Sequence, residues 1–397
     1  MQIYADYAAT APLRPAALQA MTPWLAGTGF GNASSMYALA REAKRGLEQA
    51  RCDVALALGV MPEEVFFTSG GTESDNWALK GVMEVGALAG KKHFITTAIE
   101  HPAIMQTSMW LERQGMEYTS LPADSVGRVS PESAADAVRP DTKLISVMYA
   151  NNEIGTIQPV SEIFAAAKEK NPQIICHTDA VQAAGQIDLD IGNADMVSLS
   201  GHKMGGPKGI GVLVIRKGVA ISPLMHGGHH ERNRRSGTEN VAGAAGLAAA
   251  ITESVQKLPD TQRHLLRMRV RLIQGILGIP YSRLTGDPSK RLPGHASFVF
   301  ESAEGESLVL GLDLAGISVS SGSACSSAAL EASHVLLAIG LPHELAHGSV
   351  RFTLGAGVTE EEIDYIVETT KRVVAERRAI SPVWDAEQNK PVPFETL

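Results

Sequence analysis

Apolar and polar residues alternate with two different periods along the first two-thirds of the chain. Short apolar runs rich in β-branched and aromatic residues predict strands over Val65–Thr68, His93–Thr97, Leu144–Tyr149, Ile174–Thr178, Met196–Ser200 and Gly211–Ile215. Between these runs the apolar residues recur at helical spacing, which predicts helices over Tyr37–Leu58, Glu73–Ala89, Ala103–Gln114 and Val160–Lys170. This alternation predicts an α/β fold with a mostly parallel sheet and helices on both of its faces. Ligands of such folds bind beyond the carboxyl ends of the strands.

The pattern changes near Leu258, where an Arg-rich helix is expected to lead into a second unit. Its predicted elements are helix Thr261–Leu277, strands His295–Phe300 and Ser349–Leu354, and helix Thr359–Ile380. A chain of 397 residues suits two domains. We therefore predict a large domain over residues 13–258 and a smaller α+β domain formed by residues 1–12 and 259–397. The final stretch, from residue 381, is Pro-rich and polar, so we expect it to wrap the surface or to be partly disordered.

Composition excludes several classes of function. With 44% hydrophobic and 20% charged residues and a net charge of −8, the chain resembles a soluble globular protein without a basic face for nucleic acid or lipid. No uncharged run is long and apolar enough to span a bilayer, and no basic-then-apolar leader opens the chain, so we expect a cytoplasmic protein. The cysteines Cys52, Cys176 and Cys325 are too few and scattered for a disulfide framework or a metal site. Cys52 and Cys176 are expected to be small core residues.

Three residues carry chemistry that becomes specific in combination: Lys203 in Ser-Gly-His-Lys, Asp179 in His-Thr-Asp-Ala-Val-Gln, and Cys325 in Ser-Gly-Ser-Ala-Cys-Ser-Ser. A lysine can form a Schiff base, an aspartate can keep a pyridine nitrogen protonated, and a thiolate can attack sulfur. Taken singly, the lysine is usually a solvated charge and the aspartate a cap or turn residue. Together they indicate a pyridoxal-phosphate enzyme that moves sulfur.

Two further segments support this hypothesis. Gly70-Gly71-Thr72 follows a predicted strand and opens a helix, so its free N–H groups could hold a phosphate. The alternative is a tight turn with Thr72 as the helix N-cap. Cys325 lies among Ser, Ala and Gly residues, which suits a mobile tether that carries a thiol into a pocket and out again, whereas a core cysteine normally has larger apolar neighbours.

The order of the motifs resembles the NifS/IscS-type cysteine desulfurases of the class-V aminotransferase, fold-type I pyridoxal-phosphate enzymes. Before Asp179 come Thr68-Ser69-Gly70-Gly71-Thr72, Glu100-His101-Pro102 and Asn151-Asn152-Glu153-Ile154-Gly155, and after Lys203 come Arg235-Ser236-Gly237-Thr238, Cys325 and Ser349-Val350-Arg351-Phe352. The resemblance runs from Tyr4 to about Pro382. It implies the aspartate aminotransferase-like fold of these transferases.

The resemblance also implies roles for individual residues. Lys203 would hold the cofactor covalently and then move the substrate Cα proton, Asp179 would bind the pyridine nitrogen, and His101 would stack on the ring. Further cofactor contacts would come from Gly71, Thr72, Asn152, Gln182 (at the phenolic oxygen), Ser200, His202 and, from a neighbouring subunit, Thr238. Asn152 and Arg351 would bind the substrate carboxylate, since a guanidinium can form two parallel hydrogen bonds to it. Taken alone, His101 could be a structural histidine and Arg351 a structural ion pair.

The activity implied by the resemblance is conversion of L-cysteine to L-alanine by a homodimer, with the sulfur left as a persulfide on Cys325. Its context is similar to the long-loop group, whose members usually pass sulfur to a protein, here an iron–sulfur scaffold or a tRNA-thiolation protein. Alternatives are a selenocysteine lyase, another class-V enzyme such as an aminotransferase, and a degenerate assembly partner. The first two have no need of Cys325, and the third would have lost Lys203, Asp179 or Cys325. A nicotinamide enzyme would carry an early Gly-x-Gly-x-x-Gly, which is absent from the first part of the chain.

Four positions depart from the family pattern. Gly205 stands where an aromatic residue is common, His229 replaces a glycine, and Gly348 and Ala356 replace a common Ser and Arg. We expect these departures to affect the shape of the pocket and the choice of partner more than the reaction.

Overall fold

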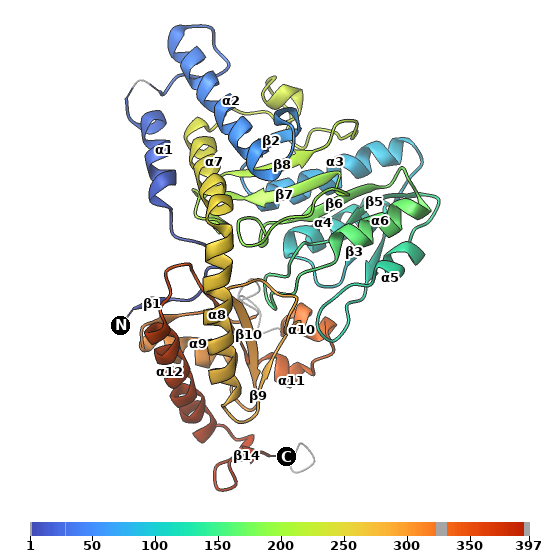
Figure 1. Cartoon of the computed structure of the whole chain (residues 1–397). Helices are drawn as coiled ribbons and strands as arrows, with labels where there is room; N and C mark the ends of the chain where they lie inside the picture. Colours follow the sequence, from blue (N-terminus) through green and yellow to red (C-terminus); the bar gives the residue numbers. More distant parts are fainter. Residues whose placement is uncertain (1, 28, 323–331, 393–397) are drawn as a thin grey trace.

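A seven-stranded sheet forms the centre of the larger part of the molecule (Figure 1). A computed structural model describes residues 2–27, 29–322 and 332–392. Within them the strand order is β2-β8-β7-β6-β5-β3-β4. β8 runs antiparallel to both of its neighbours, and the other neighbouring pairs run parallel. The predicted mostly parallel sheet is therefore confirmed. Its strands are β2 (Val65–Thr68), β3 (His93–Thr97), β4 (Glu117–Leu121), β5 (Thr142–Ser146), β6 (Ile175–Asp179), β7 (Met196–Ser200) and β8 (Gly211–Ile215).

Helices cover both faces of this sheet, as the alternation of elements predicted. Successive side chains of a strand point to opposite faces, so Val65 and Phe67 belong to one buried cluster and Phe66 to another. The first cluster packs against the helices α1 (Pro15–Leu25), α2 (Ala38–Leu58), α5 (Pro131–Asp136), α6 (Val160–Lys170) and α7 (Val241–Gln256). The second packs against α3 (Gly71–Leu88) and α4 (Pro102–Arg113). Because both faces are buried, nearly every residue of the inner strands is buried as well.

The smaller part is built around a three-stranded antiparallel sheet with the order β12-β10-β9. The long helix α8 (Leu258–Leu277) descends into it from the larger part (Figure 1). The remaining elements are β9 (Ser282–Leu284), β10 (His295–Phe300), α9 (Gly305–Leu314), β11 (Ile317–Ser318), α10 (His334–Ala338), α11 (His343–Ala346), β12 (Ser349–Thr353) and α12 (Glu360–Ala379). The first strand, β1 (Ile3–Tyr4), pairs in parallel with β11, so the start of the chain lies beside its C-terminal third. The domain boundaries at residues 12 and 258 stay a prediction.

Differences from the predicted elements are small and have local causes. β5 ends at Ser146, earlier than predicted, yet Val147 and Tyr149 still donate backbone hydrogen bonds to His177 and Asp179 of β6. β4 was not predicted, because its residues are half exposed and partly polar at the edge of the sheet and do not form an apolar run. The tail to residue 392 forms the hairpin β13 (Trp384–Asp385) and β14 (Lys390–Pro391), and it packs on the smaller part through Arg378, whose guanidinium lies 4.4 Å from the Trp384 ring centroid.

The two cysteines within the described residues differ in environment. Cys176 is buried in β6, as expected, and burial raises the pKa of its thiol. The expectation for Cys52 was wrong, because its side chain is exposed on α2. Cys52 is exposed because it lies one residue outside the buried stripe of α2, which contains Arg51 and Val54.

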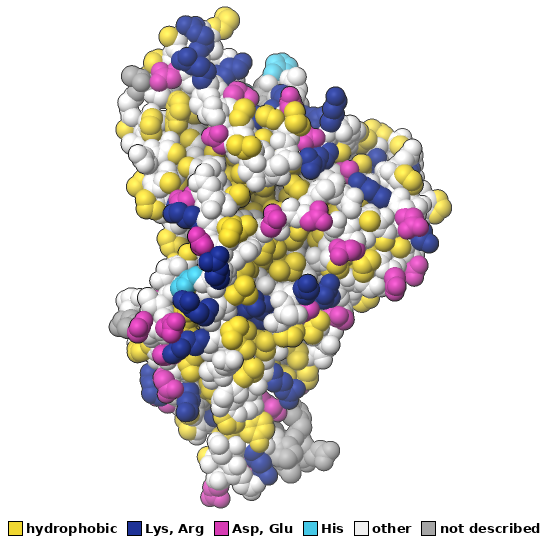
Figure 2. Space-filling model, in the orientation of Figure 1, with side chains coloured by type: hydrophobic (Ala, Val, Ile, Leu, Met, Phe, Trp, Pro, Cys, Tyr) yellow, Lys and Arg dark blue, Asp and Glu magenta, His cyan; other side chains and the backbone are white. Residues whose placement is uncertain are grey.

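The surface gives two results that bear on partners. Figure 2 shows acidic and basic side chains interspersed over one face of the described residues, so this face is not the basic surface that nucleic-acid binding requires. Among the described helices, none is both long and apolar enough to cross a bilayer.

Candidate active site

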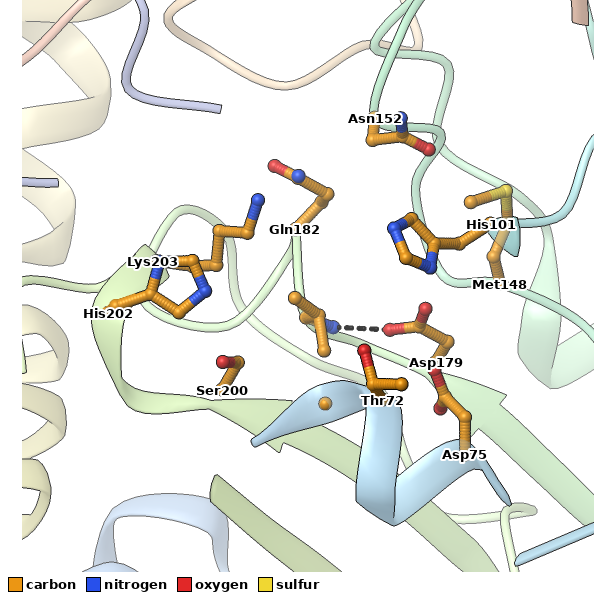
Figure 3. A pocket seen from close by; sticks show the side chains of 12 residues that line it. Thr72, Asp75, His101, Met148, Asn152, Asp179, Gln182, Ser200, His202 and Lys203 are labelled. Atoms are coloured by element: carbon orange, nitrogen blue, oxygen red, sulfur yellow. Dashed lines mark hydrogen bonds between the residues drawn. The ribbon is translucent and has the colours of Figure 1, made fainter. Parts of the chain in front are cut away.

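A cavity of about 240 Å³ opens at the carboxyl ends of β6 and β7, beside the N-terminus of α3. This is the position predicted for a ligand of a parallel sheet. Figure 3 shows its walls. The lining residues are Gly71, Thr72, Asp75, His101, Met148, Asn152, Asp179, Val181, Gln182, Ser200, His202 and Lys203. Most of the residues singled out in the sequence therefore lie around one cavity, although they come from segments far apart in the chain.

One end of the cavity is formed by the start of α3. Gly70 is the N-cap and no side chain caps the helix, so the alternative with Thr72 as N-cap was wrong. A Cβ on Gly71 would come 2.7 Å from the Val181 side chain, which shows how closely this turn packs against the segment after β6. An uncapped helix N-terminus leaves N–H groups unpaired within the helix and favours a negative charge.

Two polar side chains face the same end from the segment that leaves β7. Ser200 is the last residue of that strand, and His202 follows it in a short 3-10 helix (Gly201–Lys203). Burial and the nearby Lys203 lower the pKa of His202 to about 4, so its ring is neutral at neutral pH. The Nδ1 atom of His202 is 3.1 Å from the Thr10 hydroxyl oxygen. A hydroxyl and a neutral imidazole thus join the start of α3 in a region suited to an anion.

Asp179 lies at the inner side of the cavity, as the last residue of β6. Its Oδ1 accepts a hydrogen bond from the Val181 backbone N–H at 2.9 Å. Burial raises the pKa of this carboxyl, while His101 and Lys203 act in the opposite direction. The carboxylate therefore favours a partner that brings positive charge.

His101 and Asn152 form one wall, opposite Lys203 and Gln182 (Figure 3). His101 is the N-cap of α4, and its Nδ1 accepts a hydrogen bond from the Ala103 N–H at 3.1 Å. Burial lowers the pKa of His101, whereas the nearby Asp179 acts to raise it. An imidazole fixed in this way presents a flat face to the cavity.

Lys203 and Gln182 both contact the segment at which the family resemblance begins, for which no role was predicted. The Lys203 ammonium and the Gln182 amide both donate to the carbonyl oxygen of Ala8, the latter at 3.0 Å. Thr10 meets His202 from the same segment. No sequence signal could have identified Ala8, because a backbone carbonyl carries no residue-specific pattern.

Arg351 lies in β12 and does not line the cavity. It donates from Nη1 to the carbonyl oxygen of Asn152 at 2.8 Å and from Nη2 to Asp6 Oδ1 at 2.8 Å. Its side chain is 6% exposed and that of Asp6 16%. Arg351 is thus an ion-pair partner that is also bonded to the backbone of a cavity-wall residue, and its role in binding a substrate carboxylate stays a prediction.

A further predicted site residue lies away from the cavity. Thr238 is exposed and does not line the cavity of its own chain. Cys325 lies outside the described residues. Described residues near the two ends of its segment lie close to Glu153. Gly322 N–H donates to the Ser349 hydroxyl at 3.1 Å, and a Cβ on Gly322 would come 3.3 Å from Glu153 Oε2; the Ser333 hydroxyl donates to Glu153.

Asp75, Met148 and Val181 line the cavity but had no predicted role. Asp75 had a signal, because it is an acidic residue on the buried side of a helix that follows a Gly-Gly turn. Met148 and Val181 follow strands that end at the cavity, which places them there without any unusual residue type.

The departures from the family pattern fit their surroundings. Gly205 adopts φ +85°, and a Cβ there would come 2.7 Å from Arg14 Cγ, so Arg14 occupies the space beside it. A Cβ on Gly348 would come 2.3 Å from the Phe300 carbonyl oxygen. Ala356 is exposed, and His229 is an exposed residue bonded to Asn233 at 2.6 Å. None of the four lines the cavity.

The family model and the similar proteins found by comparison agree on one family. The family model described as Aminotransferase class-V matches residues 3–366. The chain is 49% identical over 387 residues to "Cysteine desulfurase IscS" of Methanosarcina thermophila, which covers 97% of this chain and 95% of that protein. A solved structure described as "NIFS-LIKE PROTEIN" has a TM-score of 0.89 at 38% identity and covers 95% of this chain and 100% of its own. Another, "SspA in complex with cysteine", has a TM-score of 0.78 at 34% identity and covers 89% and 99%.

Proposed function

The chain belongs to the class-V aminotransferase family, among cysteine desulfurases of the NifS and IscS type, and from this premise we propose that it converts L-cysteine to L-alanine and transfers the sulfur to Cys325. The observation that carries the proposal is the meeting of Lys203, Asp179, His101 and the start of α3 around one cavity. A second class-V reaction, transamination, would use the same cavity but has no step for a thiol.

The cavity fits pyridoxal 5'-phosphate, which the family uses. At one end, the uncapped N-terminus of α3, the hydroxyls of Thr72 and Ser200 and the neutral His202 supply donors for a phosphate. At the other end, Asp179 forms no ion pair within the described residues, which leaves its carboxylate available to a protonated pyridine nitrogen. Gln182 would bind the phenolic oxygen and His101 would lie on the ring.

When bound, the cofactor supplies an electron sink for charge that develops at the substrate Cα. The chain supplies the remaining functions. Lys203 would hold the cofactor and later take the proton from the substrate Cα and return it, as a general base and acid must lie within hydrogen-bond reach of that atom. Asn152 and Arg351 would fix the substrate carboxylate, for which Arg351 keeps donors beyond those used for Asn152 and Asp6.

Sulfur transfer needs a thiol, and none of the described residues that line the cavity has one. We propose that the Cys325 thiolate attacks the substrate sulfur, that the C–S bond breaks with its electron pair going to the substrate carbon, and that the sulfur remains on Cys325 as a persulfide. The persulfide would pass to an acceptor protein, either an iron–sulfur scaffold or a tRNA-thiolation protein. A reducing compartment such as the cytoplasm would keep this thiol free.

Borohydride reduction tests the proposed function. Reduction of the protein loaded with pyridoxal 5'-phosphate should place a stable pyridoxyl label on the Lys203 peptide, because reduction converts the carbon–nitrogen double bond to an amine. Lys208, an exposed lysine in the same segment, is the internal control. A label on Lys208, or formation of a keto acid in place of alanine from L-cysteine, would contradict the proposal.

From the family resemblance we propose a homodimer in which Thr238, exposed in its own chain, completes the phosphate site of the partner. Subunits carrying Lys203→Ala and subunits carrying Thr238→Ala are each expected to be impaired. A mixed dimer would contain one doubly damaged site and one intact site, so mixing should restore part of the alanine production. Formation of mixed dimers without recovery of activity would show that each site is built from a single chain.

A further inference from the structure

A second carboxyl group lies behind Asp179. Asp75, on α3, is 1% exposed, and Figure 3 shows its carboxyl directly below that of Asp179. The two carboxyl groups lie next to each other, and Asp75 Oδ1 is a buried polar atom without a hydrogen-bond partner among the described residues. Two carboxylates in contact cannot both be ionised in a buried place, so one of the pair must hold a proton.

Within the described residues, no lysine or arginine forms an ion pair with Asp75. The imidazole of His177 on β6 is 3.8 Å from Asp75 Oδ1, but burial lowers the pKa of His177 to about 3, so the ring is neutral. The Ser198 hydroxyl on β7 contacts Asp75 as well. Glu100, which follows β3, is a third buried carboxyl, and burial raises its pKa to about 8, so it too is neutral near pH 7.

Asp179 differs from Asp75 in its surroundings. It accepts the Val181 N–H, and it faces His101 and Lys203, both of which favour its ionised form. Burial and the neighbouring Asp179 oppose the ionisation of Asp75 and raise its pKa well above the usual range, and the Ser198 hydroxyl acts in the opposite direction. The negative charge of the pair therefore belongs to Asp179 and the proton to Asp75.

We propose that Asp75 is a positioning residue of the active site: as a neutral carboxylic acid it donates a hydrogen bond to Asp179 and keeps that carboxylate ionised and aimed into the cavity. The proposal rests on the proposed function, in which Asp179 binds a protonated pyridine nitrogen. Helix α3 would then contribute twice to the active site, with its N-terminus at the phosphate and with Asp75 at Asp179. Asp75 touches neither substrate nor cofactor in this role and acts through Asp179.

Two substitutions test whether Asp75 acts as a neutral hydrogen-bond donor or as a charged carboxylate. Asp75→Asn keeps a neutral donor of the same shape, whereas Asp75→Ala removes it. Loss of a hydrogen bond to a charged group should lower kcat/KM of Asp75→Ala roughly tenfold to a hundredfold. It should also move the acid limb of the pH profile to higher pH, because Asp179 then takes up a proton more readily. Asp75→Asn should rescue both properties.

Glu100→Gln is the matched control, because it replaces another fully buried, neutral carboxyl that does not line the cavity. It should leave the acid limb where it is in the parent protein. If Asp75→Asn instead moves the acid limb to lower pH, Asp75 is a carboxylate and the proposal is overturned. Identical profiles of Asp75→Ala and the parent protein would overturn it as well.

An infrared measurement on the apoprotein tests the protonation state without any turnover. Isotope-labelled aspartate separates the carboxylic-acid band of Asp75 from that of Glu100. We expect a protonated aspartate band at neutral pH that disappears in both Asp75 variants and persists in Glu100→Gln. Absence of that band from the parent protein would refute the proton assignment. A protein that shows the band but forms no alanine from L-cysteine would contradict the proposed function and leave the proton on Asp75.

Discussion

Cys325→Ala is expected to abolish the enzyme persulfide while leaving cofactor binding intact. The thiolate attack on the substrate sulfur is the step that distinguishes desulfuration from other reactions of this family, and Cys325 is the thiol assigned to it. Among the described residues that line the cavity none contains a thiol, so none of them can substitute for it. Mass spectrometry after incubation with L-cysteine, without reductant, measures the result directly as one additional sulfur atom on the protein.

The other two cysteines provide controls of different kinds. Cys176 is buried, and burial raises the pKa of its thiol, so Cys176→Ala should retain activity and lose on the order of 1 kcal/mol of stability. Cys52 is exposed on α2, so Cys52→Ala should retain activity and should leave no cavity in the core. Because the Cys52 thiol is exposed, it could react with sulfur species in solution, so it is the more stringent control. A persulfide mapped to Cys52 or Cys176, or full alanine production by Cys325→Ala, would disprove the assignment.

Asp179→Ala is expected to bind part of the normal amount of cofactor and to lose roughly 10²–10³-fold in kcat, the usual effect of removing one electrostatic contact from the charge that develops during a reaction. Asp179 must be ionised to hold a pyridine nitrogen in its protonated form. Burial raises the pKa of this carboxyl, so turnover of the parent protein should fall as the pH drops through that raised value. Asp179→Ala should lose this acid limb together with most of its rate.

Asp195→Ala is the control for Asp179→Ala. Asp195 also touches β6, through the Cys176 N–H at 2.8 Å, and it pairs with Lys168, yet it does not line the cavity. Its loss should lower stability without a comparable loss of kcat. Thermal unfolding and steady-state rates of the two variants measure these properties separately. Near-normal kcat in Asp179→Ala would rule out the role of this carboxylate.

The local pattern of apolar residues was sufficient to predict most strands of the central sheet. β2, β3, β7 and β8 have the predicted bounds, because both faces of these strands are buried and each is a short apolar run between polar segments. The edge strand β4 is half exposed and lacks such a run, so its sequence resembles a loop. Helix α8 begins at Leu258, before the predicted Thr261, because Pro259 is tolerated in the first turn of a helix.

The sequence by itself determined which residue types could perform the chemistry. Lys203, Asp179, His101 and Thr72 each stand directly after a predicted strand or at the start of a helix, and the carboxyl ends of parallel strands meet at one edge of the sheet. This rule of topology, together with the family resemblance, was enough to bring them to one cavity.

Only the tertiary structure decided the contacts that tune these groups. Ala8 meets Lys203 across 195 positions of the chain, and Arg351 meets Asp6 across 345. Whether Asp75 holds a proton depends on the burial of the pair it forms with Asp179, and whether Cys52 is accessible depends on which side of α2 faces the sheet. Burial and long-range pairing arise only when the elements pack, so no local pattern of residues can carry them.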